Sequence, residues 1–115
     1  MAKRRKPLKP PRTIAFNRQS GLCYYCEQPM WSGDLREFAL KHNISIGQAK
    51  RFMCTGEHLE AHKDGGKANQ SNIVAACWFC NQKRHKRKEP PPPDQYKKLV
   101  HQRLSQNRWH DLRLN

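Results

Sequence analysis

Two C-x-x-C pairs, Cys23/Cys26 and Cys77/Cys80, constrain this chain more than any other feature of its sequence. At this spacing both sulfurs of a short turn can approach one ion at about 2.3 Å, so two pairs complete a tetrahedral zinc site. Four thiolates leave no open position, which makes the predicted zinc structural and not catalytic. Paired core cysteines and a redox C-x-x-C motif are the alternative interpretations of the same spacing.

The two pairs are separated by 50 residues, which exceeds the gap of a small zinc ribbon. A shared ion would therefore close a long loop and tie both ends of one domain together. The chain has 115 residues, of which 36% are hydrophobic, so a single domain with a modest core would gain from such a staple. The fifth cysteine, Cys54, lies on a predicted strand and is expected to be a buried apolar residue, with a ligand or reactive thiol as the alternative.

Charge points to the class of partner. The chain has 23 Lys plus Arg against 9 Asp plus Glu, a formal net charge of +14. Such a surplus favours association with a polyanion, so nucleic acid is the expected partner. No apolar run approaches the roughly 20 residues that cross a bilayer, and we expect a soluble, non-secreted protein. Cysteine pairs used for metal fit a reducing compartment, which predicts a cytoplasmic location. We expect this to be the cytoplasm of a bacterium or of a phage-infected host.

The composition divides the chain into four segments. Residues 1–19 carry seven Lys or Arg, three prolines and no acid, so we expect a basic, disordered arm that either solubilises the protein or contacts phosphates. Residues 20–89 form the predicted folded domain. Residues 90–93 are a polyproline spacer. Residues 94–115 are expected to form a helix capped by Asp94, which packs on the core, pairs with a second copy or lies along DNA.

Local patterns predict a small α+β domain. A helical insertion is expected at about 34–51, where Ser45 and Gln48 have the spacing of a capping box. Its two short helices form either a hairpin that covers the core or a helix-turn-helix unit. Strands are expected over 52–60 and 73–77, and a helix over 81–88.

The combination "EHLEAHKDGG…SNIVAACWFCNQKR" resembles the HNH (His-Asn-His) endonuclease family. In that family an acid-His pair ends a first strand, a Gly-Gly loop leads to an Asn, and a C-x-x-C-[HN]-x-x-[KR] segment opens a helix. The resemblance covers about residues 23–88. It implies a ββα-metal core, a hairpin followed by a helix, that hydrolyses phosphodiester bonds in DNA.

The resemblance also implies roles for individual residues. His58 would be the general base that activates water, while Glu57 and Asn81 would hold a catalytic divalent cation. Asn72 would fix the loop that carries the base. His85 is either a further metal ligand or a solvent-facing histidine of a basic helix. Oxygen ligands suit Mg²⁺ or Mn²⁺, and a nitrogen from His85 would extend the choice to Ni²⁺ or Co²⁺.

The sequence departs from the family pattern at two positions. Glu57 stands where Asp is commoner, and Ala61 stands where Pro is frequent. Adjacent strand residues point to opposite faces, so we expect a bend or bulge that brings Glu57 and His58 to the same site. His62 is expected to be a loop histidine with no assigned role, and contact with DNA or with water on the metal is the alternative.

A row of cations follows Asn81 and is expected to hold double-stranded DNA by its phosphates, with little intrinsic sequence specificity. These residues are Lys83, Arg84, Lys86, Arg87 and Lys88. Specificity would come from the insertion, the arm, the C-terminal helix, a homodimer or a partner protein. The competing interpretation is a non-catalytic zinc-stapled nucleic-acid-binding module, or an accessory subunit of a phage or mobile-element system for DNA processing.

Overall fold

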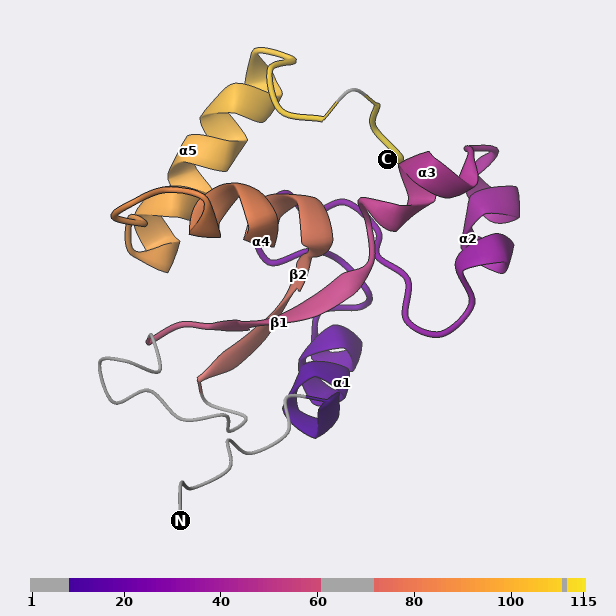
Figure 1. Cartoon of the computed structure of the whole chain (residues 1–115), viewed down its shortest axis with the longest axis horizontal. Helices are drawn as coiled ribbons and strands as arrows, with labels where there is room; N and C mark the ends of the chain where they lie inside the picture. Colours follow the sequence, from indigo (N-terminus) through magenta and orange to yellow (C-terminus); the bar gives the residue numbers. More distant parts are fainter. Residues whose placement is uncertain (1–8, 61–71, 111) are drawn as a thin grey trace.

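The computed structural model describes residues 9–60, 72–110 and 112–115, and it has a small α+β fold, as predicted. Five helices and one antiparallel hairpin appear in the described residues. In chain order these are α1 (Lys9–Arg18), α2 (Leu35–His42), α3 (Ile46–Lys50), β1 (Cys54–His58), β2 (Ile73–Cys77), α4 (Trp78–His85) and α5 (Pro93–Ser105). Helix α1 lies on one side of the hairpin, and α4 and α5 lie on the other (Figure 1).

The hairpin pairs residue by residue, from Cys54 opposite Cys77 to His58 opposite Ile73. All of β2 is buried, because helices cover both faces of the hairpin. The end of β1, where a bend or a bulge was expected, has no bulge, since each β1 residue has one partner and none is inserted. Regular pairing turns the side chains of Glu57 and His58 to opposite faces of the strand.

Helix α4 begins at Trp78 and ends at His85, three residues earlier at each end than the predicted helix over 81–88. The second C-x-x-C pair is itself the first turn of this helix. Cys77 is the N-cap residue, and its Sγ accepts a hydrogen bond from the backbone N–H of Cys80 at 3.4 Å. The usual N-cap residues are Ser, Thr, Asp and Asn. Because Cys77 takes this place, sequence rules based on those residues do not predict the start of the helix.

The predicted disordered arm is wrong for the part that is described, because Lys9–Arg18 is helical; residues 1–8 lie outside the described residues. Pro10 and Pro11 stand in the first turn, where a helix needs no backbone N–H from them. Ala15 is fully buried in the core cluster that includes β2 residues. Just after the helix, the Gln19 side chain donates to the Ala75 carbonyl at 2.8 Å and accepts from the Ala75 N–H at 2.9 Å, so it binds β2 as a further strand would.

The expected insertion at 34–51 contains α2 and α3. The Asp34 side chain caps α2 by accepting from the Glu37 N–H, and Ser45 and Gln48 form both bonds of a capping box at α3. The two helices enclose a second small core of buried residues, which consists of Phe38, Ala39, Ala49 and Phe52. The insertion is thus a helical hairpin with its own apolar centre.

Helix α5 differs from the predicted 94–115 helix at both ends. It begins at Pro93, with Pro92 at the N-cap position, and Asp94 forms no side-chain cap there. Proline suits the first helical position because its φ is already close to helical. The helix ends at Ser105, shortly before Asn107 adopts a left-handed φ of 55° that redirects the chain.

The residues after α5 return across the domain toward α3 (Figure 1). The Trp109 indole packs edge-on against Phe79 and donates from Nε1 to Cys80 Sγ at 3.2 Å. Further on, Leu112 and Leu114 pack against the second core, and the Leu114 N–H donates to Gln28 at 2.7 Å. The C-terminal segment therefore joins the main core to the insertion.

The main core surrounds the four paired cysteines. Its largest fully buried side chains include Tyr25 and Tyr96, whose rings meet edge-on at 4.8 Å between centroids. The Tyr96 hydroxyl donates to the Cys80 carbonyl at 2.8 Å, so α5 is bonded to the first turn of α4. No helix in the described part of the chain is long and apolar enough to cross a bilayer.

Candidate active site

The four paired cysteines converge on a single point. The sulfurs of Cys23, Cys26, Cys77 and Cys80 lie within 4.8 Å of one another, and all four residues are buried. Cys26 Sγ and Cys77 Sγ are 3.9 Å apart. A tetrahedral ion with bonds of about 2.3 Å separates its ligand sulfurs by about 3.8 Å, so these four sulfurs fit a structural zinc ion.

Hydrogen-bond donors surround the sulfurs. Cys23 Sγ accepts from the backbone N–H groups of Tyr25 at 3.4 Å and Cys77 at 3.3 Å, and Cys80 Sγ accepts from the Trp109 indole. Such donors stabilise the negative charge that thiolate ligands bring into a buried site. They also fix the direction in which each sulfur points.

The pKa of Cys23 and the pKa values of Cys77 and Cys80 are shifted in opposite directions. Burial acts to raise the pKa of Cys23, but hydrogen bonds from Cys26, Cys77 and Cys80 outweigh it and hold that pKa well below its usual value. Burial and the nearby sulfurs raise the pKa values of Cys77 and Cys80 well above theirs. Zinc ligation needs deprotonated sulfur, so binding of the ion releases the remaining protons.

Cys54 stands apart from this cluster, as expected. It is 4% exposed within the main core, and burial raises its pKa to about 11. A thiol with so high a pKa holds its proton at neutral pH and is a poor nucleophile. Cys54 is therefore a packing residue.

Glu57 of β1 is an unusual charged residue, because its side chain is only 2% exposed. Its Oε1 lies 3.0 Å from His85 Nε2 and 3.3 Å from Arg84 Nη1, and its Oε2 accepts from the Tyr25 hydroxyl at 3.3 Å. A buried carboxylate needs such partners, since an uncompensated charge in a core is strongly destabilising. The arrangement fixes the position of the carboxylate from three directions.

Arg84 was predicted to be one of the DNA-binding cations, and the structure corrects this. It is 8% exposed, with Nε and Nη2 donating to the Pro91 carbonyl at 3.2 and 3.0 Å while Nη1 faces Glu57. The guanidinium therefore joins β1 to the proline turn between α4 and α5. The other four cations of the row, Lys83, Lys86, Arg87 and Lys88, are exposed.

Asn81 lies one helical turn before His85. Its Nδ2 donates to Thr55 Oγ1 at 2.9 Å, and that hydroxyl donates to the Ala76 carbonyl at 2.6 Å. The amide nitrogen thus faces the hairpin. A pocket of about 180 Å³ opens beside Asn81, and its lining is Thr55, Trp78, Asn81, Gln82 and His85.

Asn72 extends the hairpin beyond the last strand pair. Its side chain accepts from the Glu60 N–H at 2.7 Å and donates to the Glu60 carbonyl at 3.1 Å. These two bonds hold the backbone just after His58, which ends β1 and is half-buried. The structure thus brings Glu57, Asn81 and His85 together between β1 and α4, with His58 on the opposite face of β1.

Two residues that contact the Glu57 carboxylate, Tyr25 and Arg84, were not predicted from the sequence to do so. Tyr25 lies inside the first C-x-x-C pair, where nothing in the pattern indicates that its hydroxyl crosses to β1. Arg84 sits in a row of similar cations, and only its spacing from the helix start marks it as inward-facing. His62 and the Gly-Gly loop lie outside the described residues.

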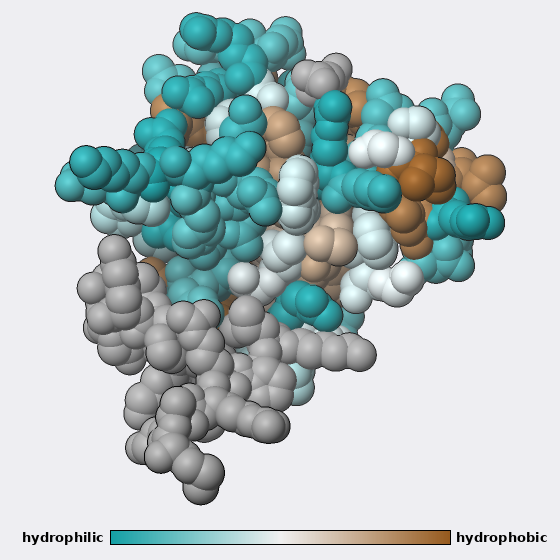
Figure 2. Space-filling view, in the orientation of Figure 1, coloured by the Kyte–Doolittle hydropathy of each residue, from teal (hydrophilic) through white to brown (hydrophobic). Residues whose placement is uncertain are grey.

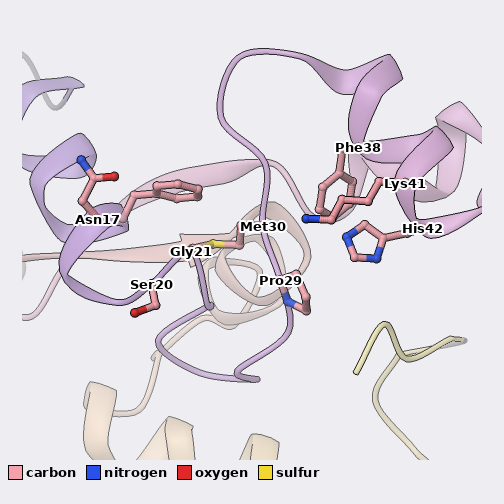
Figure 3. A pocket seen from close by; sticks show the side chains of 9 residues that line it. Asn17, Ser20, Gly21, Pro29, Met30, Phe38, Lys41 and His42 are labelled. Atoms are coloured by element: carbon pink, nitrogen blue, oxygen red, sulfur yellow. The ribbon is translucent and has the colours of Figure 1, made fainter.

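A larger pocket of about 320 Å³ lies away from these residues, between the end of α1 and α2. In Figure 3, Asn17 and Ser20 stand on one side of it and Phe38, Lys41 and His42 on the other. Burial, followed by the charge of Lys41, lowers the pKa of His42. None of the candidate site residues lines this pocket.

A comparison with family models supports the resemblance seen in the sequence. The model described as HNH endonuclease matches residues 46–87, which span α3, the hairpin and α4. No curated protein and no solved structure matches the chain. Residues 46–87 thus match the HNH endonuclease family model, and nuclease-type activity on nucleic acid is the general function that this match supports.

Proposed function

We propose that this protein is a metal-dependent DNA endonuclease in which Glu57, Asn81 and His85 hold a divalent cation and His58 is the general base. The observation that carries the proposal is the contact of 3.0 Å between buried Glu57 and His85, beside a pocket that Asn81 and His85 both line. A carboxylate and an imidazole in contact beside a pocket are donors of the kinds that divalent metals take.

The donor atoms fit a cation of this kind. Glu57 offers carboxylate oxygens, Asn81 an amide oxygen, and His85 an imidazole nitrogen on a side chain that is 53% exposed. Oxygen donors suit Mg²⁺ or Mn²⁺, and the imidazole also admits Ni²⁺ or Co²⁺. When bound, the cation supplies Lewis-acid polarisation of the phosphoryl oxygen and stabilises the leaving 3′ oxygen.

His58 and Asn72 have complementary roles in this proposal. A neutral imidazole at His58 takes a proton from the attacking water. Because water attacks the phosphorus directly, the reaction needs no covalent intermediate. Asn72 holds the backbone that follows His58 through its two bonds to Glu60. Because His58 and Glu57 face opposite ways, the scissile phosphate must lie across the edge of β1 that does not pair with β2, where both faces are within reach.

The substrate is held by exposed cations near the C-terminal end of α4. Lys83, Lys86, Arg87 and Lys88 are exposed, and the surface over α4 and α5 is strongly hydrophilic in Figure 2. Lysine and arginine contacts to phosphates position a duplex without reading its sequence. We therefore propose double-stranded DNA as the substrate, with little intrinsic specificity. A monomer offers one such site and would nick, while cutting both strands requires a dimer or a partner.

A non-catalytic binding module or accessory subunit is the competing function. One observation favours it, since the Arg84 guanidinium already balances the charge of Glu57. Against it, plain nucleic-acid binding has no use for a buried carboxylate in contact with a half-exposed histidine. A phage or mobile-element system that supplies specificity through partners is compatible with either function.

Plasmid cleavage with Mg²⁺ or Mn²⁺ separates the two functions. We expect the wild-type protein to nick supercoiled plasmid, and the His58→Ala variant to bind it without nicking. His101→Ala is the matched control, because His101 is an exposed histidine on α5 outside the candidate site. A wild-type protein that binds plasmid but leaves it intact with every divalent ion would establish the binding module instead.

A further inference from the structure

Trp78 presents an aromatic surface on a rigid base. It is the first residue of α4, between the cluster residues Cys77 and Cys80, and its backbone N–H donates to the Met53 carbonyl at 2.8 Å. Its side chain is nevertheless 38% exposed. Backbone bonding and the two flanking cysteines thus fix the backbone from which this indole extends.

The surroundings of Trp78 differ from those of an ordinary exposed apolar residue. It lines the pocket of about 180 Å³ together with polar side chains, among them Thr55 and Gln82. Asn81 and His85, two of the proposed cation ligands, line the same pocket. Any phosphate bound by those ligands would place its own nucleotide next to the indole.

We propose that Trp78 stacks on an unpaired nucleobase beside the scissile phosphate, so that the protein favours double-stranded DNA with a gap over a fully paired duplex. This inference rests on the proposed function, which places the phosphate at Glu57, Asn81 and His85. Every nucleobase has a π-face, so stacking on an aromatic side chain requires no particular sequence. In an intact duplex the neighbouring base pairs cover those faces, and only an unpaired base can present one.

The remaining pocket residues fit a base better than an apolar partner. The Gln82 amide and the Thr55 hydroxyl can both donate and accept hydrogen bonds, as the edges of bases do. Two exposed cations, Lys83 on the same helix and Lys86 at its C-cap, attract a polyanion. An aromatic surface among hydrogen-bonding groups and cations is the usual composition of a site for single-stranded nucleic acid.

The test compares two labelled duplexes that differ only in a central gap of a few nucleotides, in the His58→Ala background to prevent cleavage. We expect Trp78→Ala to weaken binding of the gapped duplex by about tenfold, within the range found for loss of one stacked base. Binding of the paired duplex should stay unchanged, and Trp78→Phe should keep most of the preference. Leu40→Ala is the matched control, because Leu40 is an exposed apolar residue on α2.

Intrinsic fluorescence gives a second measurement on the same complexes. Trp109 is 8% exposed and Trp31 is half-buried with its indole bonded to the Ala49 carbonyl, so quenching by the gapped duplex should vanish in Trp78→Phe. Equal losses on both duplexes would mean a groove contact, and no loss on either would mean a surface for a partner protein; each overturns the inference. A wild type that quenches with gapped DNA yet never cleaves plasmid would contradict the proposed function and not the stacking.

Discussion

The Tyr25 hydroxyl donates a hydrogen bond to Glu57 Oε2 at 3.3 Å, which connects the first C-x-x-C turn directly to the buried carboxylate of β1. Burial, followed by the charge of Glu57, raises the pKa of Tyr25 far above its usual value, so the phenol keeps its proton and remains a donor. The cysteine cluster and the candidate cation site are therefore parts of one packed unit.

This link predicts that Tyr25→Phe changes the cation requirement without removing zinc. A hydrogen bond to a charged group contributes about 1.5–3 kcal/mol, so we expect nicking to need at least about tenfold more Mn²⁺. Zinc content should stay at one per chain. Tyr24→Phe is the control, since Tyr24 is half-buried next to it and lies under Lys97. An unchanged Mn²⁺ titration for Tyr25→Phe would show that the bond does not position Glu57.

Removal of the structural ion should unfold the domain. The cluster connects two segments that are 50 residues apart in the sequence. The free energy of metal binding at such a site contributes directly to the free energy of folding. We expect elemental analysis to find one zinc per chain, and both Cys26→Ser and a strong chelator to abolish the cooperative thermal transition. Cys54→Ala should keep its zinc, because Cys54 is buried outside the cluster. Folded protein that contains no zinc would rule out this site.

Two arginines three positions apart, Arg84 on α4 and Arg87 just after this helix, should behave differently. Arg87→Ala removes an exposed cation, so it should weaken DNA binding, lower the salt slope by about one and leave thermal stability unchanged. Arg84→Ala leaves Glu57 with a buried, less compensated charge and should cost about 3–5 kcal/mol of unfolding free energy. Salt-dependent binding and urea titrations measure the two effects. Similar profiles for both variants would contradict the buried position of Arg84.

Cys54 gives a prediction about pH. Its pKa is raised from 9.0 to about 11 by burial, so the folded state keeps the proton after the unfolded chain has lost it. Stability from this group is complete below about pH 9 and is lost as pH rises to about 11, by an amount on the order of 2 kcal/mol. Urea titrations of wild type and Cys54→Ala should therefore differ in their pH dependence only above about pH 9. Parallel curves throughout would mean that the thiol is not buried.

Much of the fold follows from local sequence signals. The run "IVAAC" is β2, and the Ser45–Gln48 spacing is a formed capping box at α3. The four cysteines do converge, as two C-x-x-C pairs that share one ion require. These predictions succeeded where a pattern has one dominant physical cause.

The errors arose where tertiary contacts outweigh local signals. Its basic residues and prolines made the α1 segment look disordered. The helix is stabilised by the burial of Ala15, and the hydrogen bonds of Gln19 to β2 follow it directly. Composition could not separate Arg84 from its exposed neighbours, because only a helix that begins at Trp78 turns it inward. The return of the chain after Ser105 depends on Trp109 meeting Cys80, a long-range contact that no local pattern encodes.

The most direct test of the proposed site is plasmid nicking as a function of Mn²⁺ concentration, with wild type compared to Glu57→Gln. The amide has nearly the same shape as the carboxylate but no charge, so it loses its attraction for both the cation and Arg84. Thermal unfolding of the variant checks that it is folded in the assay. The account predicts nicking that saturates with Mn²⁺ for wild type and none for folded Glu57→Gln. Equal nicking by both proteins would contradict a cation held by Glu57.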